Sequence, residues 1–286
     1  LVDSMQTVAE RSSAHLVKIV GAVGSGKSRL LTEFSRLSNE KHEARIVYGR
    51  STRSIGSFMA PVRLGLLSYL SSVYGSFEDG IKELLASSLT QAVASSDTVS
   101  GPGLELLDSF FRGDDVFQHG CENAQALRKT LFWAITHLLK AIAGDRVCVL
   151  VMADAHLADE TLQEFVEHLL GDAGSHSRTL ICWEMQVTAE NLEEARDKFS
   201  HPQTGLLELM SLDQDAVSEL VKSILAPVGR VPHWVIEWIC SQAEGRPLYV
   251  LEHMRSLKAL RLLTIDSEMG TWSIVPEKPS EIVLPP

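Results

Sequence analysis

The sequence predicts an α/β protein in which a parallel sheet of about five strands has helices on both sides, with a helical lid after it. Three observations predict this class. The apolar run His15–Val20, broken only by Lys18, leads through a glycine-rich loop into an amphipathic helix. Val147–Met152 is six consecutive apolar residues, which is typical of a strand covered on both faces. Strands alternate with helices up to about residue 212, and helices follow from there to about residue 263.

Apolar spacing predicts the elements that flank the glycine-rich loop. Residues 1–13 carry apolar side chains at helical intervals, so a short helix is expected before the first strand. After the loop, Leu30, Phe34 and Leu37 are spaced four and three residues apart and predict one face of a helix. A second strand is expected over Ala44–Tyr48.

Residues 51–123 form a variable helical and loop region. Within it, Pro61–Leu70 has a helical pattern, and Ser87–Gly103 is rich in Ser, Thr and Gly, which predicts a mobile loop. The remaining core elements are expected to be a helix from Ala124 ended by Gly144, a strand at Val147–Met152, a helix capped by Asp159 and ended by Gly171, and strands at Thr179–Trp183 and Leu206–Met210.

These patterns divide the chain into a core at 1–212, a helical lid at 213–263 and the start of a following domain at 264–286. The lid helices are expected at 214–225, 232–243 and 248–263. A hairpin is expected at Thr264–Val275, with Gly270 in its turn. Because the chain begins at Leu1 and ends in two prolines, we expect it to be a piece of a larger protein.

Composition narrows the class of partner and the compartment. The formal net charge of -11 argues against general nucleic-acid binding, which depends on clustered Lys and Arg. The four cysteines are far apart and form no CxxC pair, so we expect reduced thiols in a cytoplasmic protein, without a zinc site. No apolar stretch reaches the roughly 18 residues that a membrane span needs, and no secretory leader is evident.

The glycine-rich loop matches G-x-x-x-x-G-K-[ST] at every fixed position, between a predicted strand and a predicted helix. This context predicts a P-loop that binds the phosphates of ATP, ADP or a related nucleotide. Glycine lets the backbone amides approach the phosphates, the lysine ammonium contacts the β and γ phosphates, and the Ser28 hydroxyl is a ligand for Mg²⁺. The predicted nucleotide contacts are Gly21, Ala22, Val23, Gly24, Ser25, Gly26, Lys27, Ser28 and Arg29.

A carboxylate is expected at the end of a neighbouring strand, where it would hold the Mg²⁺ or orient the attacking water. Asp154 follows the apolar run Val147–Met152 after one residue and is the candidate for both the metal and the catalytic role. Asp159 is interpreted as a helix cap, and His156 as a packed or hydrogen-bonded loop histidine. In the lid, Gly245 and Pro247 are explained locally as a helix stop and a helix start.

Taken in order, these elements resemble the STAND class of signalling P-loop ATPases within the AAA+ grouping, as found behind class III adenylyl cyclase domains and in large LuxR-type regulators. The resemblance lies in Val20–Phe34, Val147–Leu170 and Ala243–Glu252. It implies a five-stranded ATPase core with a helical lid, Pro247 over the nucleotide, and a winged-helix domain after the lid. It also implies partners in other domains or proteins, and a nucleotide-dependent oligomer.

The chain departs from that family at the acidic pair. Ala153 stands at the first, metal-holding position and only Asp154 remains, so hydrolysis is expected to be weak; a shift of the alignment by one residue would instead make Asp154 the metal ligand. Trp183-Glu184 stands where the family often has a small polar or basic sensor residue. Arg178 and Arg246 remain weaker candidates for phosphate contacts.

The leading hypothesis is a regulatory ATP-binding switch whose nucleotide state moves the lid, with slow hydrolysis acting as a timer. The alternatives are a competent ATPase motor or remodeller in which Asp154 activates water, and a scaffold that no longer needs nucleotide. A DNA-binding ATPase similar to origin-recognition proteins is disfavoured by the acidic charge balance.

Overall fold

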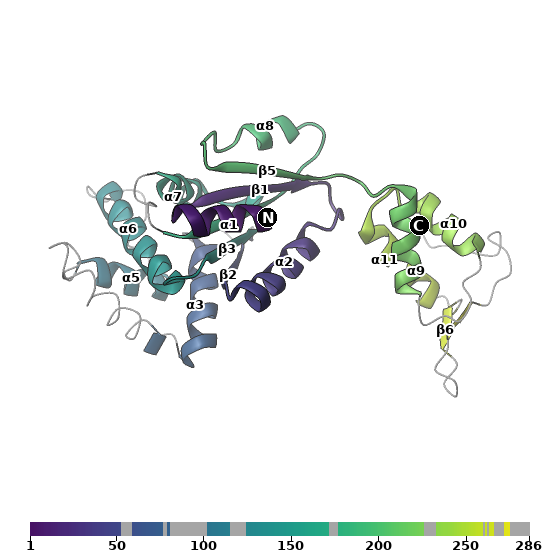
Figure 1. Ribbon diagram of the computed structural model, residues 1–286, viewed down its shortest axis with the longest axis horizontal. Helices are drawn as coiled ribbons and strands as arrows, with labels where there is room; N and C mark the ends of the chain where they lie inside the picture. The colour runs from purple at the N-terminus through teal and green to yellow at the C-terminus, as the bar shows by residue number, and fades with distance from the viewer. Residues whose placement is uncertain are drawn as a thin grey trace. The chain divides into compact units, whose positions relative to one another are not determined.

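A five-stranded sheet with strand order β2-β3-β4-β1-β5 organises the N-terminal part of the chain (Figure 1). The computed structural model describes residues 1–52, 59–76, 79–80, 102–114, 124–171, 177–225, 233–259, 261, 263–265 and 272–274. The strands are β1 His15–Gly21, β2 Arg45–Arg50, β3 Cys148–Ala153, β4 Thr179–Gln186 and β5 Thr204–Leu209. The sheet is parallel and flanked by helices, so the predicted α/β class is confirmed.

The strand β3 lies inside the sheet and every one of its residues is buried. It pairs in parallel with β2 on one side and with β4 on the other. The run Val147–Met152 is entirely apolar because neither face of the strand contacts water, as was predicted from its sequence. Burial also raises the pKa of the β3 thiol Cys148 and of the β4 thiol Cys182 to about 12. Cys121 lies outside the described residues.

Helices cover both faces of this sheet. The helices described before β5 are α1 Val2–Arg11, α2 Lys27–His42, α3 Ala60–Tyr74, α5 Pro102–Arg112, α6 Ala124–Ala143, α7 Glu160–Leu170 and α8 Leu192–Asp197, with a 3-10 turn η2 at Ala155–Leu157. Alternate residues of β3, such as Leu150 and Met152, share one core with α6 and α7. Val149 and Val151 point to the other face, where α1 contacts the sheet through β4.

The chain divides into two compact units, each of which we describe by itself. The first comprises residues 1–20 and 28–207 and contains most of the sheet. The second comprises residues 21–27 and 208–286, so it includes most of the glycine-rich loop. Its helices α9 Gln214–Ile224, α10 His233–Gln242 and α11 Pro247–Ala259 enclose a separate apolar core.

Most predicted elements are confirmed, but one predicted boundary is wrong and two helices were not predicted. The last lid helix ends at Ala259 rather than at residue 263, because Arg261 adopts a left-handed φ of 56° and Leu263–Ile265 form a strand, β6. Helix α8 was not predicted, and neither was α5, which begins inside the predicted loop Ser87–Gly103. Residues 87–101 of that loop lie outside the described residues.

The short strand β6 pairs in antiparallel fashion with β7 Trp272–Ile274, as the predicted hairpin requires, although its turn at Gly270 is not among the described residues. Among the helices that the structure describes, none is long and apolar enough to cross a membrane.

Candidate nucleotide-binding site

The glycine-rich loop connects β1, which ends at Gly21, to α2, which begins at Lys27. Gly24 and Gly26 have φ values of 77° and 97°, in a region that residues with a Cβ atom rarely adopt. Gly21 is required for a different reason. A Cβ atom there would lie 2.7 Å from the Ser25 hydroxyl oxygen and 3.0 Å from the Leu209 carbonyl oxygen. The motif glycines therefore meet two needs, backbone conformation and space.

Lys27 is folded against its own loop. Its Nζ donates to the carbonyl oxygens of Gly21 at 3.0 Å and Ala22 at 2.9 Å, and the residue is 7% exposed. A lysine ammonium is rarely buried to this degree unless polar groups surround it. The charge is thus held at the loop, where an incoming polyphosphate would meet it.

The first turn of α11 contacts the loop within the second unit. The Leu248 amide donates to the Gly24 carbonyl at 3.2 Å, and the Pro247 Cγ lies 3.9 Å from where a Cβ atom on Gly26 would be. Gly245, just before this helix, has a φ of 71°, and a Cβ there would lie 2.4 Å from the Leu212 carbonyl oxygen. The structure thus brings the lid segment that contains Pro247 to the phosphate loop.

Ser28, the last residue of the motif, contacts a carboxylate that was not among the predicted site residues. Its hydroxyl donates to Glu184 Oε1 at 3.1 Å. Glu184 lies on β4 and is only 2% exposed, and its other oxygen, Oε2, is buried without a hydrogen-bond partner among the described residues. The sequence signal for this role is a lone acidic residue directly after the apolar run Leu180–Trp183.

Asp154 follows β3 in a left-handed conformation, with a φ of 52°. Its Oδ2 lies 3.4 Å from the Nε of Arg50, the last residue of β2, and both side chains are partly exposed. The Tyr48 phenol raises the pKa of Arg50, and the carboxylates of Asp154 and Glu184 add to this effect. The Arg50 guanidinium is therefore paired with Asp154, the residue that follows β3.

Two neighbouring residues have structural roles that match their interpretation from sequence. Asp159 caps α7, since its Oδ1 accepts from the Leu162 amide at 2.7 Å. His156 Nδ1 accepts a long 3.5 Å hydrogen bond from the Gln186 amide.

The two arginines named as weaker phosphate candidates are both engaged elsewhere. Arg178 donates from Nε to the Ser12 hydroxyl at 3.0 Å and from Nη1 to the Asp145 carbonyl at 2.5 Å, at the N-terminal end of β4. Arg246 donates to the Tyr249 hydroxyl at 3.1 Å and packs over that ring.

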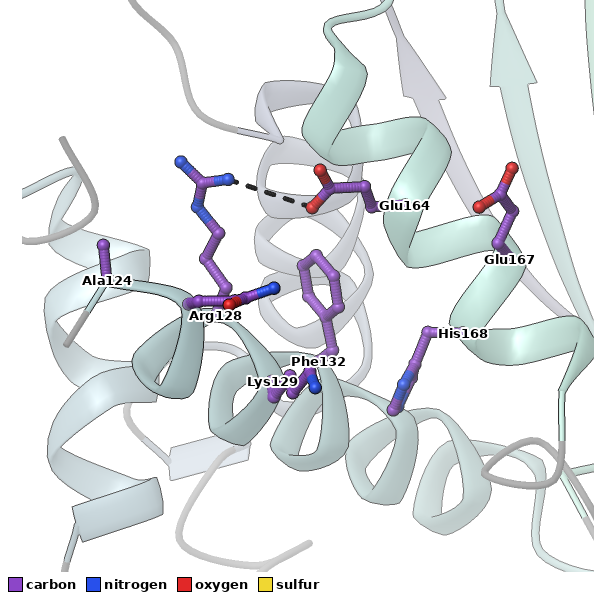
Figure 2. A pocket seen from close by; sticks show the side chains of 8 residues that line it. Ala124, Arg128, Lys129, Phe132, Glu164, Glu167 and His168 are labelled. Atoms are coloured by element: carbon purple, nitrogen blue, oxygen red, sulfur yellow. Dashed lines mark ion pairs between the residues drawn. The ribbon is translucent and has the colours of Figure 1, made fainter. Parts of the chain in front are cut away.

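A separate pocket of about 660 Å³ lies between α6 and α7 (Figure 2). Its lining includes Arg128, Lys129, Phe132, Glu164, Glu167 and His168. Arg128 and Glu164 form an ion pair at 3.9 Å. Because basic and acidic groups are mixed along this lining, the pocket selects no ligand charge, and none of the predicted site residues lines it.

The groups that fit a magnesium ion are the Ser28 hydroxyl and the carboxylates of Glu184 and Asp154, all in the first unit. Mg²⁺ prefers oxygen ligands and is usually held by one or two protein groups together with phosphates and water. Ser28 and Glu184 provide adjacent oxygens, one of them without a hydrogen-bond partner, and Asp154 follows the neighbouring strand. This donor set suits the ion.

A family model agrees with this fold. The family model described as AAA ATPase domain matches residues 1–182. Cdc6p from Pyrobaculum aerophilum superposes with a TM-score of 0.47 and 13% identity, over 91% of this chain and 62% of that chain. For the AMPPCP-bound DnaA from Aquifex aeolicus the TM-score is 0.41, with 11% identity, over 90% of this chain and 59% of that chain.

A Drosophila ORC structure bound to DNA gives a TM-score of 0.39 and 13% identity, over 90% of this chain and 55% of that chain. The chain therefore spans less than two thirds of the length of these three structures. No curated protein matches the chain in sequence.

Proposed function

We propose that this chain, which belongs to the AAA ATPase family, is an ATP-binding regulatory switch domain of a larger signalling protein. The observation that carries the proposal is the complete phosphate loop and its hydrogen bond from the Leu248 amide of α11 to the Gly24 carbonyl. A loop that holds phosphate and also holds the first turn of a lid helix is suited to transmit nucleotide state. The resemblance to STAND-class modules supports the signalling context, with adenylyl cyclase domains or LuxR-type regulators as the neighbouring parts.

The proposed nucleotide contacts are the loop residues Gly21–Ser28 together with Arg29 and Pro247. Backbone amides of the loop and the Lys27 ammonium would bind the phosphates. Ser28 would hold Mg²⁺, with Asp154 after the neighbouring strand as a further ligand or as the residue that orients water. The ion would supply neutralisation of phosphate charge.

Slow hydrolysis is the expected activity. The reaction would add water to the γ-phosphorus and break its bond to the β-γ bridging oxygen, giving ADP and phosphate. Asp154, the water-orienting candidate, is paired with Arg50, and Ala153 provides no second carboxylate on β3. Because the Arg50 guanidinium holds the Asp154 carboxylate in an ion pair, we expect hydrolysis to be slow and the domain to stay in the ATP-bound state long enough to signal.

The site of action that we propose is the cytoplasm, with other domains or proteins as partners and a nucleotide-dependent oligomer as one form of output. The buried thiols Cys148 and Cys182 are free, as suits a reducing compartment.

Calorimetric titration with ATP and Mg²⁺ tests the proposal through Lys27→Ala. Loss of a charge-assisted contact, about 1.5–3 kcal/mol, predicts affinity that is lower by roughly ten- to a hundredfold. Lys41→Ala is the matched control, because it removes the same charge from an exposed position on the same helix.

Affinity that survives Lys27→Ala unchanged would defeat the switch and favour a nucleotide-independent scaffold. Rapid, steady phosphate release that collapses in Asp154→Asn would favour the motor or remodeller instead.

A further inference from the structure

The Glu184 carboxylate is the most deeply buried acidic group that the structure describes. Its Oε1 accepts a single hydrogen bond, from the Ser28 hydroxyl at 3.1 Å, and its Oε2 has no hydrogen-bond partner in the described part of the chain. Leaving a charged oxygen buried and unpaired costs free energy, and one neutral hydroxyl compensates only part of that cost. Such a group is expected to have a cation as its partner in the working protein.

The position of Glu184 in the sheet indicates which cation. The parallel strands β3 and β4 are in register at Met152 and Trp183, so Ala153 and Glu184 lie one residue further along each strand, side by side. Neighbouring residues of paired parallel strands point to the same face of a sheet. The Glu184 carboxylate thus occupies the region that an acidic side chain at position 153 would reach.

The same carboxylate contacts Ser28, the last residue of the phosphate-binding motif. Ser28 directly follows Lys27 in the motif, and its hydroxyl is the group expected to bind Mg²⁺. Donating a hydrogen bond to Glu184 leaves the Ser28 oxygen lone pairs available to a metal. One hydroxyl and one carboxylate are a sufficient protein contribution for Mg²⁺, which keeps phosphate and water as its other ligands.

We propose that Glu184 supplies the carboxylate of the Mg²⁺ site that Ala153 cannot supply. The acidic pair is then divided between Glu184 on β4 and Asp154 directly after β3. This inference rests on the proposed function, because the metal arrives with the nucleotide. Under this arrangement nucleotide binding depends on Mg²⁺ through Glu184, while hydrolysis stays limited by the pairing of Asp154 with Arg50.

Arg50 does not substitute for the metal. Its ion pair is with Asp154, at 3.4 Å, and it acts on Glu184 only as a more distant charge. Roughly half of the Arg50 side chain is exposed to solvent, which screens that interaction.

Titration of ATP with Mg²⁺ and, separately, with EDTA tests the inference, and the quantity compared is the ratio of the two affinities. In the wild type we expect Mg²⁺ to strengthen binding about tenfold or more, a ratio equivalent to at least about 1.4 kcal/mol. Glu184→Gln keeps the shape of the side chain but not its charge, and should reduce the ratio to about one to two. The affinity of this variant for ATP in EDTA should equal or exceed that of the wild type, because the negative charge that would repel the phosphates has been removed.

Two further variants separate the metal role from a folding role. Ala153→Asp combined with Glu184→Gln returns a carboxylate to the adjacent strand and should restore the ratio. Glu190→Gln removes the same charge from an exposed position after β4 and should leave the ratio unchanged. If Glu184→Gln does not fold, Glu184→Asp, which withdraws the carboxylate by one methylene, should still lower the ratio severalfold. Mn²⁺ binding to the ADP complex, measured by electron paramagnetic resonance, should fall in parallel.

A wild-type ratio in Glu184→Gln, or in Glu184→Asp if that variant has to be used, overturns this inference and leaves the proposed function standing. Absence of ATP binding by the wild type in both buffers overturns the proposed function, and this inference with it.

Discussion

Substitution of Gly24 by alanine probes the link between the phosphate loop and α11. The Gly24 φ of 77° is unfavourable for alanine by about 1–2 kcal/mol. The added Cβ would also lie 2.7 Å from the Leu248 Cβ, closer than the 3.0 Å below which such contacts essentially do not occur. The first turn of α11 must therefore move, and the hydrogen bond from the Leu248 amide to the Gly24 carbonyl is expected to break.

The Leu248 amide reports that bond directly. It belongs to the first turn of α11, where an amide has no acceptor within its own helix, and its acceptor is the loop carbonyl at 3.2 Å. A hydrogen bond of this kind contributes about 0.5–1.5 kcal/mol, so its loss should speed hydrogen exchange at Leu248 by roughly two- to tenfold.

Gly26→Ala is the matched control for Gly24→Ala. Gly26 has a comparable left-handed φ of 97°, but the nearest atom to an added Cβ is the Pro247 Cγ at an ordinary 3.9 Å. Both variants should therefore weaken ATP binding through loop strain, whereas only Gly24→Ala should accelerate Leu248 exchange, as followed by nuclear magnetic resonance. Equal exchange of Leu248 in Gly24→Ala and wild type would refute the link, as would equal acceleration in Gly26→Ala.

Three other predictions concern stability and partners. Gly49→Ala would put a Cβ 2.1 Å from the Pro61 carbonyl oxygen, where α3 packs on β2, and should lower the free energy of unfolding by about 3 kcal/mol or more in urea denaturation. At Gly103 a Cβ would meet no atom within 4 Å, so Gly103→Ala should raise the free energy of unfolding by about 0.5–1 kcal/mol. Burial lowers the pKa values of His15, His137 and His168 below 6.5. The unfolded chain therefore binds protons first, and the free energy of unfolding should decrease as the pH falls from 6.5 through the lowered pKa values. A variant with glutamine at all three positions should show a weaker dependence of stability on pH. Given the net charge of -11, duplex DNA should show no binding to this chain at low salt in fluorescence anisotropy, and salt-dependent binding would contradict that expectation.

The fold was predictable from sequence wherever a single periodic pattern determined an element. The buried run of β3, the capped helix α7 and the loop between β1 and α2 all follow from local residue types. The end of α11 was not predictable in this way, because apolar residues continue past Ala259 into β6 and no glycine marks the stop. The short helix α8 was missed because its six residues span too few turns to show a periodicity.

The site was only partly predictable. The phosphate loop has fixed residues at fixed spacing, so position alone identified it. Glu184 has no such spacing relation to Ser28, since the two are 156 residues apart and meet only because β4 and α2 adjoin in the fold. Its significance depends on burial and on the register with β3, and both of these are tertiary facts.

The phosphate-binding motif contains one residue from each of the two proposed contacts. Within the second unit Gly24 is bonded to the first turn of α11, and within the first unit Ser28, four residues later, is bonded to Glu184. Gly24 and Ser28 belong to one continuous motif, so a nucleotide that binds the motif would act on each contact within its own unit. Coupling of this kind requires that each nucleotide state favour a different arrangement of the contacts. The Mg²⁺-dependent affinity and the Leu248 exchange rate should therefore change together when ATP is replaced by ADP, and independent responses would mean that the loop binds nucleotide without transmitting its state.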